Sequence, residues 1–420
     1  MRLLLFTVGT LGDLLPLVAL GGRLKEAGHD VRVCTHGRHR EPVEAAGLGF
    51  EDHDAADPRE QMAALASAPV PGRAGGAGRW GRATGPAPRQ EPLERLVALL
   101  RGSDAFLTGY ASVWHAAAAT GTPMAFLGLY PLHPTGDFPH ALTRFGGSWG
   151  RWGNRATHRL VAQYFWRRER PWMNAWRARL GLPARPWWGG PMPPARLRTP
   201  CFYGFSEMVI PRPADWPEGA EVTGYWFPEA AVDGRPDPEL VAFLADGPPP
   251  VVVSFGSLVE SDPGRLLGRV RQATRDLGRR LVVLAGWQGD IGLGMAGDTW
   301  VCRKFVPLSW ILPRAAAFVH HAGAGTVAET LRAGVPSLAL PRSGEQRFWA
   351  RRQHRLGVSP PPLDRDRLEA GRLRMALEEA LGNAGMERER RRVKAALAAE
   401  DGPGRAVAAI HRWLEKVGRR

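Results

Sequence analysis

The 420-residue chain contains no run of 18 apolar residues, so we expect no transmembrane helix. Its first residues lack the basic region, long apolar stretch and small-residue cleavage site of a secretory signal. Cysteine is scarce, and the three positions are far apart without metal-ligand spacing: Cys34, Cys201 and Cys302. These absences favour a cytoplasmic protein and argue against a structural zinc site.

Lysine is nearly absent, so arginine carries almost all of the positive charge in a chain of net charge +15. The charge is concentrated between Arg144 and Arg198, where twelve arginines accompany one acid, Glu169, for a balance of +11. Seven tryptophans lie in the same segment: Trp149, Trp152, Trp166, Trp172, Trp176, Trp187 and Trp188. Two interpretations stay open, docking on an anionic membrane and an aromatic wall for a large apolar ligand. Nucleic-acid binding is disfavoured because no nucleic-acid module accompanies the segment.

Strand and helix signals alternate in both halves of the chain, which is typical of α/β proteins with parallel sheets. Short apolar runs predict buried strands at residues 3–8, 31–34, 105–108, 124–127, 251–255 and 281–285. Residues 55–92 are rich in Ala, Gly, Pro and Arg and predict a long, mobile insertion. The length is sufficient for two domains, each with its own core.

The most informative stretch runs from His320 to Gly357. An apolar strand leads into two histidines, a glycine turn and a helix, and a second short strand and helix follow. Such a turn lets backbone N–H groups approach an anion, and a helix N-terminus adds roughly half a positive charge. A histidine beside the turn can donate to a phosphate, Glu329 can accept from a ribose, and Glu345 and Gln346 can bond a sugar. The stretch therefore predicts a nucleotide-sugar site.

The segment HHAGAGT at 320–326, with AGVP at 333–336 and Glu345-Gln346, resembles the donor signature of nucleotide-sugar glycosyltransferases of the GT-B fold. The similarity is to the branch of sterol glucosyltransferases and vancomycin-type antibiotic glycosyltransferases, and it covers nearly the whole chain except 55–92. It implies two Rossmann-like, doubly wound domains with a donor/acceptor cleft between them. Ala322 replaces the usual Gly or Ser, a change expected to concern only the side chain. Glu345 replaces the usual Asp and leaves the donor sugar open.

The resemblance also sets the expected domains. Residues 1–215 are the acceptor-binding domain, 216–250 a proline-rich linker, and 251–400 the nucleotide-sugar-binding domain. Residues 401–420 form a last helix that crosses back to the first domain.

The opening strand ends in GTLGDLLP at residues 9–16, which resembles the family's GTxGDxxP loop. By resemblance Asp13 is the catalytic base that takes a proton from an acceptor hydroxyl, and Thr10 and Gly12 shape the loop between donor and acceptor. The alternative role for Asp13 is the N-cap of a helix that begins near Leu15.

The remaining site residues follow from the family's pattern. Phe305 stacks on the base and the backbone of Val306 bonds its edge; a core phenylalanine at a strand end is the alternative. His321 faces the diphosphate and His320 is structural. The nucleotide is held by Ser257, Gly323, Gly325, Thr326 and Glu329, and the sugar contacts Glu345 and Gln346. His115 and Asp104 are interpreted as structural.

The implied activity is an inverting transfer of a hexose from a nucleoside-diphosphate sugar, UDP-glucose by default, to a hydroxyl of a lipophilic acceptor such as a sterol. No DxD-like acidic cluster occupies a matching loop, so we expect neither metal nor cofactor. One alternative is a natural-product (polyketide or glycopeptide antibiotic) transferase that uses a UDP- or TDP-deoxysugar. Another is a non-catalytic helper of a partner transferase, against which the retained site residues argue. We expect a cytoplasmic protein, peripheral at the inner face of the membrane if residues 144–198 dock there.

Overall fold

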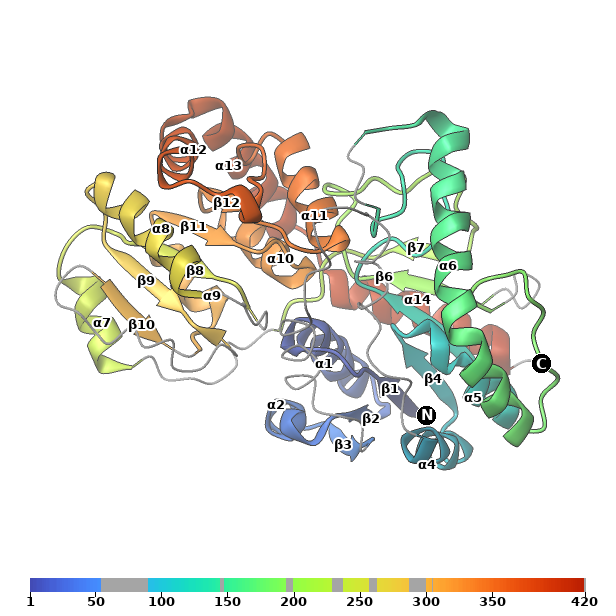
Figure 1. Ribbon diagram of the computed structural model, residues 1–420. Coiled ribbons are helices and arrows are strands. Elements are labelled where there is room, and N and C mark those ends of the chain that lie inside the picture. Colours follow the sequence, from blue (N-terminus) through green and yellow to red (C-terminus); the bar gives the residue numbers. More distant parts are fainter. Residues whose placement is uncertain are drawn as a thin grey trace. The chain divides into compact units, whose positions relative to one another are not determined.

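The computed structural model describes residues 1–53, 90–143, 147–193, 199–228, 237–256, 263–286, 300–303 and 305–418. Ser257 and most of the predicted insertion at 55–92 lie outside the described residues. The chain divides into two compact units (Figure 1). Unit 1 comprises Met1–Glu207, Pro211–Pro228 and Asp401–Arg420, and unit 2 comprises Met208–Ile210 and Glu229–Glu400.

Unit 1 is built on a parallel sheet of seven strands in the order β3-β2-β1-β4-β5-β6-β7. The strands are β1 (Arg2–Phe6), β2 (Asp30–Thr35), β3 (Gly49–Asp52), β4 (Ala105–Thr108), β5 (Met124–Gly128), β6 (Cys201–Tyr203) and β7 (Ala220–Val222). Its main helices are α1 (Leu11–Glu26), α2 (Arg40–Ala45), α4 (Gln90–Arg101), α5 (Trp114–Thr120), α6 (Gly150–Arg179) and α14 (Gly402–Gly418). The strand order reverses between β1 and β4, the place where open α/β sheets bind ligands at the carboxyl ends of their strands.

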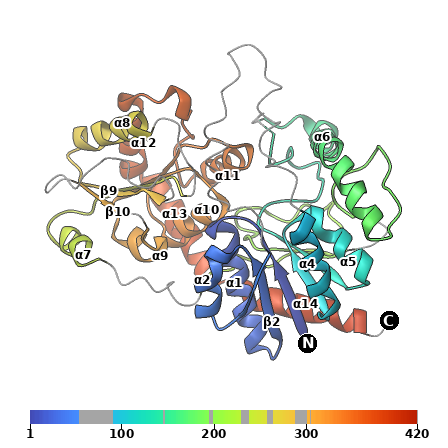
Figure 2. The ribbon, with the colours of Figure 1, turned by 60° about the horizontal axis from the view of Figure 1, so that its bottom comes forward.

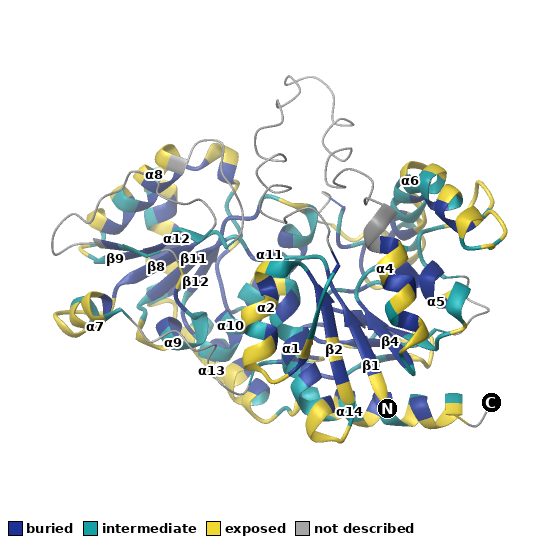
Figure 3. Ribbon diagram, turned by 90° about the horizontal axis from the view of Figure 1, so that it is seen from below, coloured by how far each residue is buried: buried dark blue, intermediate teal, exposed yellow. Residues whose placement is uncertain are grey.

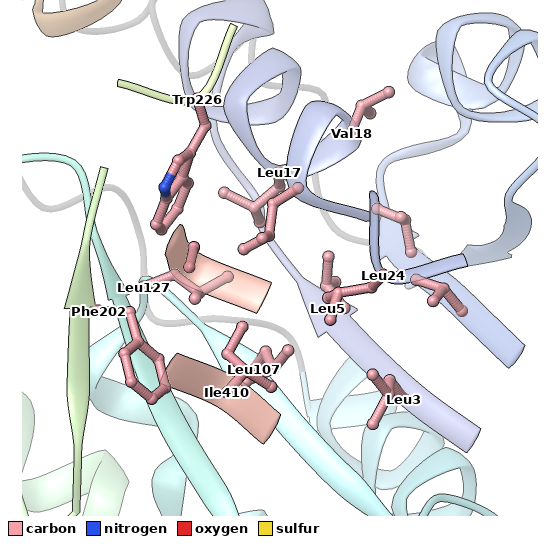
Figure 4. Packing of buried hydrophobic residues seen from close by; sticks show 14 of the residues in the cluster. Leu3, Leu5, Leu17, Val18, Leu24, Leu107, Leu127, Phe202, Trp226 and Ile410 are labelled. Atoms are coloured by element: carbon pink, nitrogen blue, oxygen red, sulfur yellow. The ribbon is translucent and has the colours of Figure 1, made fainter. Parts of the chain in front are cut away.

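Both faces of this sheet are buried, because successive side chains of a strand point to opposite sides. Leu3 and Leu5 of β1 join one core with Leu17 of α1 and Ile410 of α14 (Figure 4). The alternate residues Leu4 and Phe6 join a second core with side chains of α4, α5 and α6. The continuous apolar run that predicted β1 is therefore a strand buried on both faces.

The C-terminal helix α14 belongs to unit 1. It is drawn in red and lies beside the strands of that unit (Figure 2). Its buried residues Ala406, Ile410 and Leu414 complete the core that includes β1, and Trp413 packs against it.

Unit 2 repeats the design with five parallel strands in the order β10-β9-β8-β11-β12. They are β8 (Val251–Ser254), β9 (Leu281–Leu284), β10 (Trp300–Arg303), β11 (Ala317–His320) and β12 (Ser337–Ala339). The helices are α7 (Pro238–Ala245), α8 (Pro263–Asp276), α9 (Leu308–Ile311), α10 (Ala324–Ala333), α11 (Gly344–Arg355), α12 (Ala370–Gly382) and α13 (Ala384–Ala398). Residues of α8 and α12 cover one face and residues of α7 and α9 the other.

Colouring by exposure shows buried strands between helices whose outer faces are exposed in each unit (Figure 3). Two doubly wound parallel sheets confirm the predicted fold class. Among the helices of the described residues, none has the combination of length and apolar sequence needed to cross a bilayer.

Candidate active site

Asp13 lies in the first turn of α1, just after the turn that follows β1. Thr10 is the N-cap residue; its backbone N–H donates to Asp13 Oδ2 at 2.8 Å and its hydroxyl to the same oxygen at 3.3 Å. Asp13 is therefore not an N-cap near Leu15, because the helix begins at Leu11 and Asp13 closes a capping box with Thr10. Burial raises the pKa of Asp13, and the hydrogen bonds from Thr10 oppose this. A raised pKa makes a carboxylate a better base near neutral pH.

The turn before Asp13 requires glycine at position 9. A Cβ on Gly9 would lie 2.0 Å from Asp13 Oδ2, far inside contact distance. The Gly9 carbonyl also accepts from Nε2 of the buried His39 at 3.2 Å. The carboxylate thus packs directly against a backbone that is held from its other side, which limits its freedom to move.

In unit 2 the corresponding switch point lies between β8 and β11, and the two histidines sit there. His320 is fully buried, stacks on Phe318 at 4.9 Å between ring centroids, and accepts the backbone N–H of Ala322 on Nδ1 at 3.0 Å. Burial lowers the pKa of His320 to about 3, so the ring is neutral and can accept this bond. His320 therefore holds the turn in place.

Ala322 is the one residue other than glycine with a positive φ in the described part of the chain, at 62°. The expectation that its replacement of Gly or Ser concerns only the side chain is wrong, because the backbone is left-handed there. That conformation costs an L-residue roughly 1–2 kcal/mol. Ala322 directly follows His321. Backbone strain of this kind persists only where the surrounding structure holds the residue in place, and such residues cluster at functional sites.

The ring of His321 is clamped between two glycines. A Cβ on Gly256, which follows β8, would lie 2.8 Å from His321 Cε1, and a Cβ on Gly323 would lie 2.6 Å from its Nε2. Burial lowers the pKa of His321 to about 4, the Arg365 guanidinium adds to this, and a hydrogen bond with the Ser254 backbone opposes it. The ring is therefore neutral at pH 7 and carries a single N–H, the group that the bond with the Ser254 backbone engages.

The helix α10 begins directly after this clamp. Gly323 is its N-cap, so Gly325 and Thr326 lie in the first turn, whose backbone N–H groups have no partner within the helix. Further along, Glu329 pairs with Arg332 at 2.7 Å, and burial raises the pKa of Glu329 while Arg332 lowers it. The turn and the helix N-terminus, against which the His321 ring packs, form an anion site of the kind seen at helix starts.

The next helix, α11, starts after the neighbouring strand β12 and carries Glu345 and Gln346 in its first turn. Gln346 Oε1 accepts the backbone N–H groups of Arg342 at 2.8 Å and Ser343 at 3.1 Å. This network assigns the side-chain oxygen to the turn, so the amide nitrogen is the group left to face a ligand as a donor.

Phe305 follows β10 at the far edge of the sheet, and its ring is 55% exposed, so it is not the core residue of the alternative interpretation. Val306 is buried in the core. Three strand spacings separate β10 from β11, which is roughly 14 Å at about 4.8 Å a strand. Phe305, the α10 turn and the α11 turn therefore follow one another along the carboxyl edge of unit 2.

Other candidate groups have structural partners. Asp104 pairs with Arg2 at 3.0 Å, and His115 accepts from Arg177 at 2.8 Å in a buried site that lowers the pKa of His115 to about 2. Within the described ranges, no three His, Cys, Asp or Glu side chains gather as metal ligands do.

A family model for the erythromycin biosynthesis protein CIII-like C-terminal domain matches residues 293–412, and one for the glycosyltransferase family 28 N-terminal domain matches residues 3–69. The O-mycaminosyltylonolide 6-deoxyallosyltransferase of Streptomyces fradiae is 34% identical over 99% of this chain and 98% of its own length. The chain belongs to the GT-B glycosyltransferases.

Further relatives of this glycosyltransferase include sterol 3-beta-glucosyltransferases. One from Arabidopsis thaliana is 29% identical over 99% of this chain and 68% of its own length, and one from Candida albicans is 30% identical over 98% of this chain but 28% of its own length. Both sterol and antibiotic branches named by the signature are thus confirmed as relatives.

Solved structures share the fold of the glycosyltransferase. The glycotransferase of kitacinnamycin has a TM-score of 0.70 at 19% identity and covers 98% of each chain. VinC in complex with DTDP has a TM-score of 0.62 at 20% identity, covering 99% of this chain and 100% of its own.

The sequence did not predict the roles of three residues at the glycosyltransferase site. Gly256 has a φ of 61° and touches His321, and a Cβ on Gly286 would lie 2.0 Å from the Gly256 carbonyl oxygen. The buried Arg365 guanidinium lies 4.1 Å above the Phe255 ring. The glycines were visible as strand-end residues, but nothing in the local sequence around Arg365 marks it.

Proposed function

We propose that the glycosyltransferase moves a hexose from a nucleoside-diphosphate sugar, with UDP-glucose first, to a hydroxyl of a lipophilic acceptor such as a sterol. The observation that carries this proposal is the clamped His321 at the start of α10, beside the first turn of α11. The start of α10 offers backbone N–H groups to a diphosphate, and the start of α11 offers Glu345 and Gln346 to a sugar. Both lie at the edge where open α/β sheets bind ligands.

The order of groups along this edge supports an assignment of the donor. The exposed Phe305 ring takes the base and the Val306 backbone bonds its edge. Gly323, Gly325, Thr326 and Ser257 supply the diphosphate site, with Glu329 at the ribose. At α11, Gln346 donates to the sugar and Glu345 accepts from it, and the extra methylene of Glu345 relative to Asp reaches further toward the sugar.

Asp13 is the base in this proposal. The acceptor oxygen attacks the anomeric carbon, the bond from that carbon to the diphosphate oxygen breaks, and the acceptor proton passes to Asp13. A single displacement of this kind inverts the anomeric centre. Thr10 holds the carboxylate by two hydrogen bonds, and Gly12 leaves the turn open on the exposed side.

Negative charge develops on the leaving diphosphate as the bond breaks. Fixed N–H donors aimed at developing charge stabilise a transition state without reorganisation. The backbone N–H groups in the first turn of α10 are such donors, and on this ground we propose that transfer needs no metal ion.

A second candidate is transfer of a deoxysugar from a TDP or UDP donor to a natural product. It is favoured by the relative from Streptomyces fradiae, which matches over its whole length at 34% identity. The two candidates share every residue of the proposed chemistry and differ in the sugar at Glu345 and in the acceptor.

We also propose that the protein works at the inner face of an anionic membrane, docked through the Arg- and Trp-rich segment 144–198. A lipophilic acceptor is concentrated in that membrane, so docking brings the enzyme to its substrate.

The test is donor turnover with a panel of UDP- and TDP-sugars in EDTA, first without and then with sterol or lipid. Slow hydrolysis of one donor, accelerated by the lipid, supports the proposal. Acceleration only by a polyketide or glycopeptide aglycone with a deoxysugar donor favours the second candidate. No turnover and no thermal protection by any nucleotide sugar would overturn the donor site and leave the helper role.

A further inference from the structure

Exposed apolar side chains of the described residues gather around α6. Five of the nine large exposed ones lie at its N-cap, in the helix or in the segment that follows: Trp149, Trp152, Leu160, Trp187 and Trp188. Trp152 is 84% exposed and Trp188 69%. Of the other tryptophans in this part of the chain, Trp166 and Trp176 are buried in the core of unit 1, and the partly buried Trp172 packs against it. The structure thus sorts the seven tryptophans into a core group and a surface group.

The surface position of Trp187 and Trp188 is built into the fold. The Trp187 carbonyl accepts from Gln163 Nε2 at 3.0 Å, and Gln163 Oε1 accepts from the Gly189 backbone at 3.1 Å. The preceding carbonyl, of Pro186, accepts from Trp166 Nε1 at 2.9 Å. Side chains of α6 therefore hold the backbone on both sides of the two indoles, so their exposure is not that of a loose loop.

The same segment is fixed one step further back. Asn174 and Arg185 exchange two hydrogen bonds, at 3.1 Å and 2.9 Å, and Arg185 Nη1 donates to the Met192 carbonyl at 3.0 Å. The Arg185 guanidinium lies 4.9 Å from the Trp166 ring centroid. A backbone that is already fixed has less conformational freedom to lose on binding, which is how preorganised surfaces gain affinity.

The charge around these indoles is of one sign. The guanidinium of Arg167 lies 4.9 Å from the Trp187 ring centroid and 6.0 Å from that of Trp188. Within the described residues no carboxylate pairs with Arg159, Arg167 or Arg168, whereas Arg151 and Arg155 nearer the helix start pair with Asp137 and Asp215. Glu169, the single acid of the segment, is half-buried, and burial raises its pKa to about 7.

These residues share one face of α6. Trp152, Arg159, Leu160, Gln163 and Arg167 recur at helical spacing within about 100° of the helix circumference. The stripe from Trp152 to Arg167 is roughly 22 Å long at 1.5 Å per residue. With Trp187 and Trp188 beside Gln163 and Arg167, it forms one surface, which we call the α6 band.

We propose that the α6 band docks on an anionic lipid bilayer, with Trp152, Leu160, Trp187 and Trp188 in the interface and Arg159 and Arg167 on the lipid phosphates. Tryptophan prefers the membrane–water interface, and arginine near an anionic surface is attracted electrostatically. The lack of an exposed acid in the band favours a uniformly negative partner. These residues would form the membrane contact of the proposed function. The reason for docking, access to a lipophilic acceptor, rests on that function.

The test is flotation of the full chain with phosphatidylcholine vesicles and with vesicles that also contain phosphatidylglycerol. We expect flotation only with the anionic vesicles, lost at high salt. R159Q/R167Q should weaken partitioning about 30-fold, and W187S/W188S by at least tenfold. Two exposed positions of unit 2 provide matched controls, Met375→Ser and Arg372→Gln, which should float like the wild type.

Equal flotation on neutral and anionic vesicles, or band variants that float like the wild type, would overturn the proposal. So would no flotation at all. Circular dichroism and thermal melting check that the variants fold, as expected for exposed side chains. Donor hydrolysis in solution separates the two proposals: if hydrolysis holds and flotation fails, docking is wrong, and if flotation holds without turnover of any donor, the transfer reaction is wrong.

Discussion

Gly323→Ala probes the clamp on His321 by adding one methyl group. The new Cβ would lie 2.6 Å from His321 Nε2, whereas ordinary contact begins near 3.4 Å. The imidazole must therefore retreat by roughly 0.8 Å, while its chemistry is unchanged. The backbone of Gly323 has a φ of −65°, which alanine adopts without strain, so the ring bears most of the effect.

The magnitude follows from this displacement. A misplacement of about 1 Å in a catalytic constellation costs up to about 10²-fold in rate, which is about 2.7 kcal/mol of transition-state stabilisation. Alanine is also a poorer N-cap than glycine, which lowers the free energy of unfolding by about 1 kcal/mol. We expect kcat to fall by about 10²-fold in a protein that still folds.

The assay compares transfer and donor hydrolysis of Gly323→Ala with those of Gly371→Ala. Gly371 lies in α12 of the same unit, and no heavy atom lies within 4 Å of its added Cβ. The control should keep full activity, with an unfolding free energy unchanged or raised by about 1 kcal/mol. A Gly323→Ala enzyme with wild-type kcat would refute the placement of His321 at the reacting diphosphate.

Asp13→Asn should lower kcat by about 10²–10⁴-fold. The free energy of unfolding should change by under about 1 kcal/mol, because the Asn side chain keeps an oxygen that accepts from Thr10, whereas Asp13→Ala loses both the base and this acceptor. An Asn variant that keeps wild-type activity and a wild-type urea midpoint would exclude Asp13 as the base. Because burial raises the pKa of Asp13, the acid limb of the kcat/KM profile should lie above the ordinary aspartate pKa of about 3.9. The folded protein holds several histidines with lowered pKa values, about 4 for His133 and His321 and about 3 for His140 and His320. The unfolded chain binds those protons near pH 6.5, so the free energy of unfolding should fall as pH drops from about 6.5 toward 4, and equal urea midpoints at pH 7 and pH 5 would contradict this. Asp215→Ala should lower the free energy of unfolding by about 3 kcal/mol, because the Asp215 carboxylate accepts from Thr135, Gly136 and Arg155. The control is Asp137→Ala, which removes an exposed ion pair with Arg151 and should lower the same free energy by under about 1 kcal/mol.

The parts of the site that are local in sequence were predictable. Glycines after an apolar run, followed by helix formers, locate the α10 turn because both signals lie within about ten residues. The same holds for Gly9 to Asp13, although the helix start was placed four residues too late. The expected cap near Leu15 overlooked Thr10, which is a favoured N-cap residue in its own right.

What the sequence did not reveal depends on contacts between distant strands. The positive φ of Ala322 accompanies a bond between its N–H and the buried His320, and no propensity for alanine predicts it. The clamp on His321 needs Gly256 from another strand. The tryptophans of 144–198 also look alike in sequence, and only the packing of α6 separates Trp166 from Trp188.

We propose that Asp13 and the α10 turn perform a metal-independent sugar transfer. The most direct measurement is turnover of UDP- and TDP-sugars in EDTA with lipid acceptors, comparing the wild type with Asp13→Asn. We expect one donor to be consumed in EDTA, and we expect lipid to accelerate its consumption only in the wild type. Turnover that requires added Mg²⁺, or equal acceleration in both enzymes, would contradict it.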